Sequence, residues 1–160
     1  MRYIIFCISI IIILGGCKNN SVAPTNGQIL STSAVLDNIQ YSFAIPKAEY
    51  GIHDTLNATL TAYNQSSSTD TIYTSYSPYF YSWSLRNAGG KIIMYGPVGA
   101  DNLIRIITLN PNQSTVMYSL HQAIADTSGA TVVAGSYVLQ WNLNNRATTL
   151  LTFSLDLSLQ

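Results

Sequence analysis

The sequence predicts an all-β fold, an antiparallel β-sandwich of about seven to nine strands. The clearest observation is residues 55–64, where apolar and polar side chains alternate and give an extended chain one apolar and one polar face. Short segments of this kind recur, separated by Gly, Pro, Asn and Ser. No long segment keeps the apolar period of about 3.6 residues that a helix needs. Because a single strand cannot bury its apolar face alone, we expect two packed sheets.

The same alternation predicts the other strands. They are expected at residues 39–45, 71–76, 79–85, 91–95, 103–109, 114–120, 135–143 and 151–157. The breaks between them hold residues that favour turns, such as Pro46, Ser77-Pro78 and Asn110-Pro111. Residues 121–131 have the weakest pattern, and we expect a short helical turn around 122–125.

The alternation also assigns side chains to faces. In the strand at 114–120 it places Val116, Tyr118 and Leu120 on one side. In the strand at 135–143 it places Tyr137 and Trp141 on one face with the leucines between and after them. We expect these faces to form the core.

The composition narrows the classes of partner. Hydrophobic residues make up 48% of the chain and charged residues 9%, whereas a typical domain has about 25% charged residues. Seven basic side chains balance seven acidic ones, with no basic run to neutralise phosphates. The sequence therefore argues against nucleic acid as a partner.

The N-terminus has the pattern of a bacterial lipoprotein signal. Arg2 precedes an apolar run at 4–14, and the segment Leu14-Gly15-Gly16-Cys17 is similar to a lipobox. The run is shorter than the ~20 residues that span a bilayer. We therefore expect residues 1–16 to be a signal peptide and Cys17 to carry the lipid that anchors the protein to a membrane outside the cytoplasm.

The remaining chain divides into a tether and a domain. Residues 17–38 are rich in Ser, Thr, Asn and Gly and predict a flexible tether, followed by a domain at 39–160. A first edge strand at 29–36 stays open as an alternative. Cys7 would leave with the signal and Cys17 would carry lipid, so the domain is expected to have no disulfide.

Four segments carry a pattern seen in a known family. They are Tyr50-Gly51 with Asp54-Thr55-Leu56, the aromatic hairpin around Tyr79 and Trp83, Leu109-Asn-Pro-Asn-Gln113, and Gly135-Ser-Tyr137. Through them, residues 39–157 resemble the intracellular proteinase inhibitor domain of bacilli. The resemblance implies an immunoglobulin-like sandwich and a protein partner. This chain departs from the family at Ser75-Tyr76-Ser77-Pro78, where the family has Ser-Gly-Gln, and at Pro111-Asn112, where it has Pro-Gly. The resemblance to this family therefore supports the fold of this chain more strongly than it supports an inhibitor activity.

The sequence contains no recognisable catalytic or metal motif. His53-Asp54 and His121 with Asp126 are the histidine–acid pairings, and no nucleophile elbow accompanies them. Zinc-ligand spacing is absent, and the calcium-type oxygens of Asp101, Asn102 and Asp126 lack the alternating register of a dedicated loop. We expect no catalytic residues, metal or cofactor, and we expect His53 in an exposed turn.

The aromatic segment that begins at Tyr73 is the candidate binding patch. Its proposed contact residues are Tyr76, Tyr79, Phe80 and Tyr81. Exposed tyrosines bury a large area at low entropic cost, which suits contact with a protein. Two alternatives remain: the rings stack on carbohydrate, or they pack across strands and stabilise the hairpin. The sequence thus predicts a non-catalytic, lipid-anchored envelope protein that binds a protein, with a carbohydrate-binding or structural envelope lipoprotein as the alternative.

Overall fold

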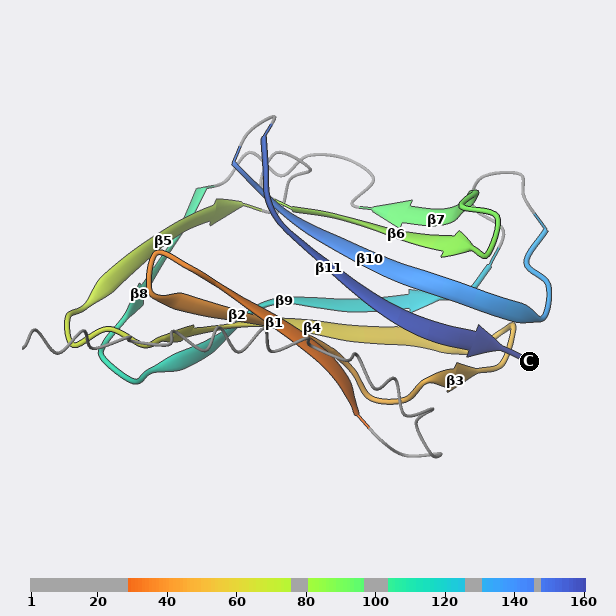
Figure 1. The fold of residues 1–160 in the computed structure, drawn as a ribbon, viewed down its shortest axis with the longest axis horizontal. Helices are drawn as coiled ribbons and strands as arrows, with labels where there is room; N and C mark the ends of the chain where they lie inside the picture. The colour runs from red at the N-terminus through yellow and green to blue at the C-terminus, as the bar shows by residue number, and fades with distance from the viewer. Residues whose placement is uncertain (1–28, 76–80, 97–103, 126–130, 146–147) are drawn as a thin grey trace, which may run out of the picture.

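The described residues form strands and turns, with no helix among them (Figure 1). The computed structural model describes residues 29–75, 81–96, 104–125, 131–145 and 148–160. The strands are β1 (Leu30–Leu36), β2 (Ile39–Ile45), β3 (Glu49–Tyr50), β4 (Thr55–Asn64), β5 (Asp70–Ser75), β6 (Tyr81–Asn87), β7 (Ile92–Gly96), β8 (Ile104–Leu109), β9 (Ser114–Ala123), β10 (Gly135–Asn145) and β11 (Thr148–Leu159).

These strands form a β-sandwich with a small additional sheet. One sheet has the order β1-β2-β4-β9 and the other the order β3-β11-β10-β6-β7. Strands β5 and β8 pair with each other as a separate two-stranded ribbon, which lies at one end of the molecule (Figure 1). Neighbouring strands run antiparallel, except that β3 runs parallel to β11. The predicted antiparallel all-β sandwich is confirmed.

Aromatic side chains from both sheets meet in the core. Phe43 on β2 lies 5.1 Å from Trp141 on β10, measured between ring centroids, with the rings edge to face. The ring centroid of Tyr118 on β9 lies 4.0 Å from that of Tyr81 on β6. Because such ring pairs add to the free energy gained by burial, this cluster helps to hold the two sheets together.

A tyrosine at the start of β10 fixes the chain where it enters the sheet. The Tyr137 hydroxyl donates a hydrogen bond of 2.7 Å to the Val133 carbonyl oxygen, four residues upstream. Immunoglobulin-like sandwiches share this tyrosine corner, in which a buried ring is tied to the backbone just before its strand. The feature agrees with the immunoglobulin-like fold that the resemblance implies.

The structure adds to the sequence-based expectations in three places. The edge strand that stayed open at 29–36 is present as β1, which pairs with β2 along its length and so precedes residue 39. The two-residue strand β3 has no alternation to reveal it. Strand β9 continues to Ala123, which replaces the expected helical turn with pairing to Thr55 on β4.

A β-bulge in β9 changes which residues face inward. Opposite Leu60 and Thr61 on β4 the register shifts, so Met117 has no partner of its own in the ladder. The extra residue interrupts the alternation. As a result Met117 and Tyr118 are both buried and Val116 is exposed, whereas the sequence predicted Val116 and Tyr118 on the same face.

Asn64, the last residue of β4, is a fully buried polar residue. Its amide nitrogen donates hydrogen bonds of 2.8 Å to the Ser68 carbonyl and 2.9 Å to the Leu109 carbonyl. Its amide oxygen accepts one of 2.9 Å from the Ser66 backbone N–H. Asn64 therefore ties the connection from β4 to β5 directly to the end of β8.

We predict that Asn64→Ala lowers the free energy of unfolding by about 3 kcal/mol, because two carbonyls and one N–H near the base of the ribbon lose their partners. Urea titration measures the change. The neighbouring variant Gln65→Ala, at an exposed position, should cost less than about 0.5 kcal/mol. Equal effects of the two variants would contradict the assignment.

Candidate functional site

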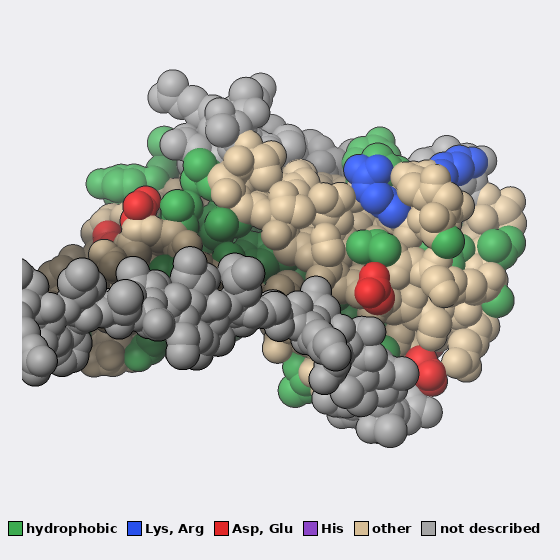
Figure 2. Space-filling view, in the orientation of Figure 1, with side chains coloured by type: hydrophobic (Ala, Val, Ile, Leu, Met, Phe, Trp, Pro, Cys, Tyr) green, Lys and Arg blue, Asp and Glu red, His purple; other side chains and the backbone are tan. Residues whose placement is uncertain are grey.

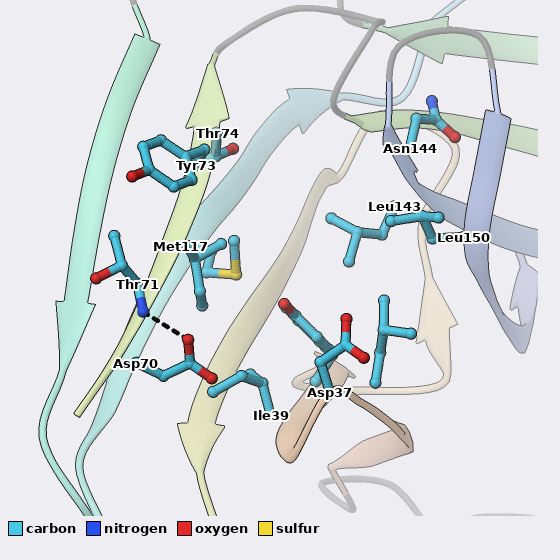
Figure 3. Close-up of a pocket in the computed structure, with 13 residues that line it drawn as sticks. Asp37, Ile39, Asp70, Thr71, Tyr73, Thr74, Met117, Leu143, Asn144 and Leu150 are labelled. Carbon is cyan, nitrogen blue, oxygen red and sulfur yellow. Dashed lines mark hydrogen bonds between the residues drawn. The ribbon is translucent and has the colours of Figure 1, made fainter. Parts of the chain in front are cut away.

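The candidate site is a cavity between the ribbon and the sandwich. Its volume is about 440 Å³, within the range of small-molecule sites. Figure 3 shows side chains reaching it from the β1–β2 turn, from β2, β5 and β9, and from the adjoining ends of β10 and β11. The described lining residues are Leu36, Asp37, Ile39, Tyr41, Asp70, Thr71, Ile72, Tyr73, Thr74, Met117, Leu143, Asn144 and Leu150.

Two carboxylates reach the cavity from different elements. Asp37 and Asn38 form the two-residue turn between β1 and β2, with φ angles of 50° and 63°. Such turns require positive φ at both positions, which Asp and Asn tolerate better than most residues. Asp70 begins β5, and its carboxylate accepts a hydrogen bond of 2.7 Å from the Thr71 N–H. The turn and the strand start therefore set where the two acids lie.

Tyr41 on β2 lines the same cavity as both acids. Burial of the ring, with the nearby charges of Asp70 and Asp37, raises the pKa of Tyr41 to about 12. The hydroxyl is therefore protonated at neutral pH and can donate or accept a hydrogen bond. Sequence reasoning missed this cluster because Asp70 on β5 is far along the chain from Asp37 and Tyr41, which belong to the β1–β2 hairpin.

The structure describes one residue of the predicted aromatic patch, Tyr81. Tyr81 is 2% exposed and lies against Tyr118 and Trp141, so it belongs to the core and not to an accessible patch. This agrees with the packing alternative for that residue. Tyr76, Tyr79 and Phe80 lie outside the described residues, as does Cys17.

The two histidines lie outside the lining of the cavity. His53 is in an exposed turn, as expected. The carboxylate of the adjacent Asp54 accepts hydrogen bonds of 2.7 Å from Lys47 Nζ and 2.9 Å from the Gly51 N–H. These hydrogen bonds lower the pKa of Asp54. His121 lies on β9 with Nδ1 2.6 Å from Asn57 Oδ1.

The described part of the chain contains neither a metal-ligand cluster nor a membrane-spanning helix. Within those residues, no three His, Cys, Asp or Glu side chains cluster closely enough to hold a metal ion. Those residues also contain no helix of the length and apolarity needed to cross a bilayer. Asp101, Asn102 and Asp126, the candidate calcium ligands, lie outside the described residues.

Comparisons with known proteins assign no family. Neither a family description nor a curated protein matches the chain. Among solved structures, a β-glucosidase from Erythrobacter marinus is similar over 82% of this chain and 16% of its own, with 12% identity and a TM-score of 0.45. The alkylpurine DNA glycosylase AlkC from Pseudomonas fluorescens is similar over 72% of this chain and 28% of its own, with 12% identity and a TM-score of 0.43. The chain thus spans less than a third of either protein, and similarity this weak carries no argument about function.

The placement of the tyrosines predicts different costs of removal. Tyr81→Ala should lower the free energy of unfolding by about 3 kcal/mol or more, because it opens a cavity among packed rings. Tyr73→Ala, at a side chain that is 64% exposed, should cost less than about 0.5 kcal/mol. Thermal or urea unfolding of both variants measures this. A stable Tyr81→Ala variant would contradict the core assignment.

Proposed function

We propose that the protein is a lipid-anchored, non-catalytic protein of the bacterial cell envelope whose sandwich binds a protein partner. The anchor rests on the leader at 1–16 and the lipobox that ends at Cys17. The twelve residue steps from Cys17 to Ile29 span at most about 40 Å. This reach keeps the domain close to the membrane and gives a partner in the envelope access to it.

The outward side of the β5–β8 ribbon gives the main support for binding to a protein. Tyr73 on β5 lies directly opposite Ile106 on β8. Ile104 lies two residues before Ile106 on the same strand, so its side chain is on the same side. The exposed fraction of the side chain is 64% for Tyr73, 63% for Ile106 and 66% for Ile104. We call these three residues the ribbon face. Aromatic and aliphatic side chains grouped without charge are typical of the centre of a protein interface.

The candidate patch of the sequence adjoins this ribbon face along the chain. Tyr76, Tyr79 and Phe80 directly follow β5 in the sequence. They remain proposed contact residues of the same partner. The resemblance to proteinase inhibitor domains also favours a protein partner.

Carbohydrate binding is the second candidate function. The exposed ring of Tyr73, on the strand that also lines the cavity, is the kind of surface on which sugars stack. A glycan array with the full chain separates the two candidates. Retention of a glycan that depends on Tyr73 would favour this candidate, and no retained glycan would remove it.

The lipid anchor predicts the behaviour of Cys17→Ser. Without the thiol that accepts the lipid, the protein should leave the membrane fraction or accumulate as an unprocessed precursor. Fractionation with mass spectrometry of the N-terminus measures this. Cys7→Ser is the matched control, because Cys7 lies inside the leader, and it should be processed normally. Unchanged processing and membrane retention of Cys17→Ser would contradict the anchor.

The ribbon face predicts which substitutions abolish partner binding. In the full chain, Tyr73→Ser with Ile106→Ser should abolish partner recovery from envelope extract without lowering thermal stability, because both side chains are exposed. Tyr95→Ser is the matched control, since Tyr95 is exposed on β7 in another sheet. Undiminished recovery by the double variant would argue against the ribbon face as the contact surface.

A further inference from the structure

The cavity holds two carboxylates that no described cation neutralises. Within the described residues, neither Asp37 nor Asp70 forms an ion pair, whereas Asp54 is paired with Lys47. Arg105 on β8 pairs in register with Thr74, but it is exposed and is not among the described lining residues. Figure 2 shows acidic and hydrophobic side chains together at the ribbon end, while the Lys and Arg side chains visible on this side lie toward the opposite end.

A buried hydroxyl in the same cavity also lacks a partner. Thr74 is 2% exposed, and its Oγ1 atom has no hydrogen-bond partner among the described residues. In Figure 3 its side chain lies on the side of β5 toward Leu143 and Asn144. A buried hydroxyl without a partner costs about 1–3 kcal/mol, which a ligand that bonds to it would recover. This observation is independent of the two acids.

The remaining walls of the cavity are largely apolar. Ile39, Ile72, Met117, Leu143 and Leu150 line it beside the acids (Figure 3). Apolar walls lower the local dielectric, so a carboxylate here attracts a cation more strongly than it would in water. They also favour a cation that is attached to a hydrocarbon stem, as in the side chains of lysine and arginine.

We propose that this cavity is a binding site for an alkylammonium or alkylguanidinium group. The N–H groups of the cation donate hydrogen bonds to the carboxylates of Asp37 and Asp70. The hydroxyl of Thr74, four residues along β5 from Asp70 and so about 13 Å away, accepts a hydrogen bond from an amide N–H at the far end of the hydrocarbon stem. The hydrocarbon stem packs on the apolar wall that includes Met117. The group comes either from a free amine or from a Lys or Arg side chain of the protein partner, and the second source rests on the proposed function.

Matched probes test this chemistry on the full chain in detergent micelles. N-acetyl-lysine methylamide is compared with its neutral counterpart N-acetyl-norleucine methylamide, and hexylamine is compared with hexanol. Methyl NMR of the methionines reports on binding, because Met117 lines the cavity and Met94 on β7 is buried away from it. We expect the cationic probes to shift the Met117 methyl signal and leave that of Met94 in place.

Three variants test the role of each polar group. Asp37→Asn with Asp70→Asn should weaken cation binding at least about tenfold, because both charges are lost. Asn tolerates the positive φ at position 37 and keeps an acceptor oxygen for the Thr71 N–H, so the fold should be retained. Asp156→Asn, at an exposed position of β11, is the matched control and should bind like the parent protein. Thr74→Val should weaken binding of the lysine derivative, which carries amide N–H donors, and leave binding of hexylamine unchanged. It should not lower the melting temperature, because the lost hydroxyl had no partner.

The outcomes distinguish the two sources of the cation and show whether the cavity binds a cation at all. Binding of hexylamine alone assigns a free amine, and binding of the lysine derivative assigns a protein side chain. Equal binding of the neutral and cationic probes, or an unchanged affinity in the double Asn variant, would overturn the proposal. That failure would leave the proposed function standing, because the anchor and the ribbon face are tested by other variants.

Discussion

The hydrogen bonds of Asn64 are the constraint on which the arrangement of this molecule depends. The chain leaves the sandwich after β4 to form β5 and returns from β8 into β9. At that junction the Asn64 side chain bonds to the β4–β5 connection and to the end of β8. Its backbone N–H and carbonyl bond to Gln113 and Asn112 in the β8–β9 connection. Because each of these polar groups is satisfied, a fully buried amide is tolerated there. The ribbon is thereby held at a fixed place beside the sandwich.

The position of the ribbon gives its two sides different environments. Alternate residues of β5 point in opposite directions, so Thr74 is buried and Ile72 is half-buried, while the Tyr73 side chain between them is 64% exposed. The bulge in β9 adds Met117 to the wall, and the β1–β2 turn brings Asp37 to the same place. A short two-stranded ribbon thus presents an apolar outer face and closes an acidic cavity. Both features suit contact with a partner that carries apolar and basic groups.

The sequence predicts the parts of this structure that depend on local alternation. The inward faces of β2, β4 and β10 follow directly from apolar residues at every second position, and their burial is confirmed. Strand β1 could only be left open, because Ser and Thr interrupt its apolar residues. The bulge at Met117 arises from pairing between β4 and β9, and no local pattern reveals it. The cavity was also missed, because Asp37 comes from the β1–β2 turn and Asp70 and Thr74 from β5, and these segments line one cavity only through tertiary packing of the ribbon on the sandwich.

Amide hydrogen exchange of the full chain tests most directly whether the ribbon is an integral part of the fold. If the Asn64 contacts hold it against the sandwich, the paired amides of β5 and β8 should be protected to nearly the same degree as those of β4 and β9. Fast exchange throughout β5 and β8, with the two main sheets still protected, would contradict this account. In that case neither the cavity nor the ribbon face would exist as a fixed surface.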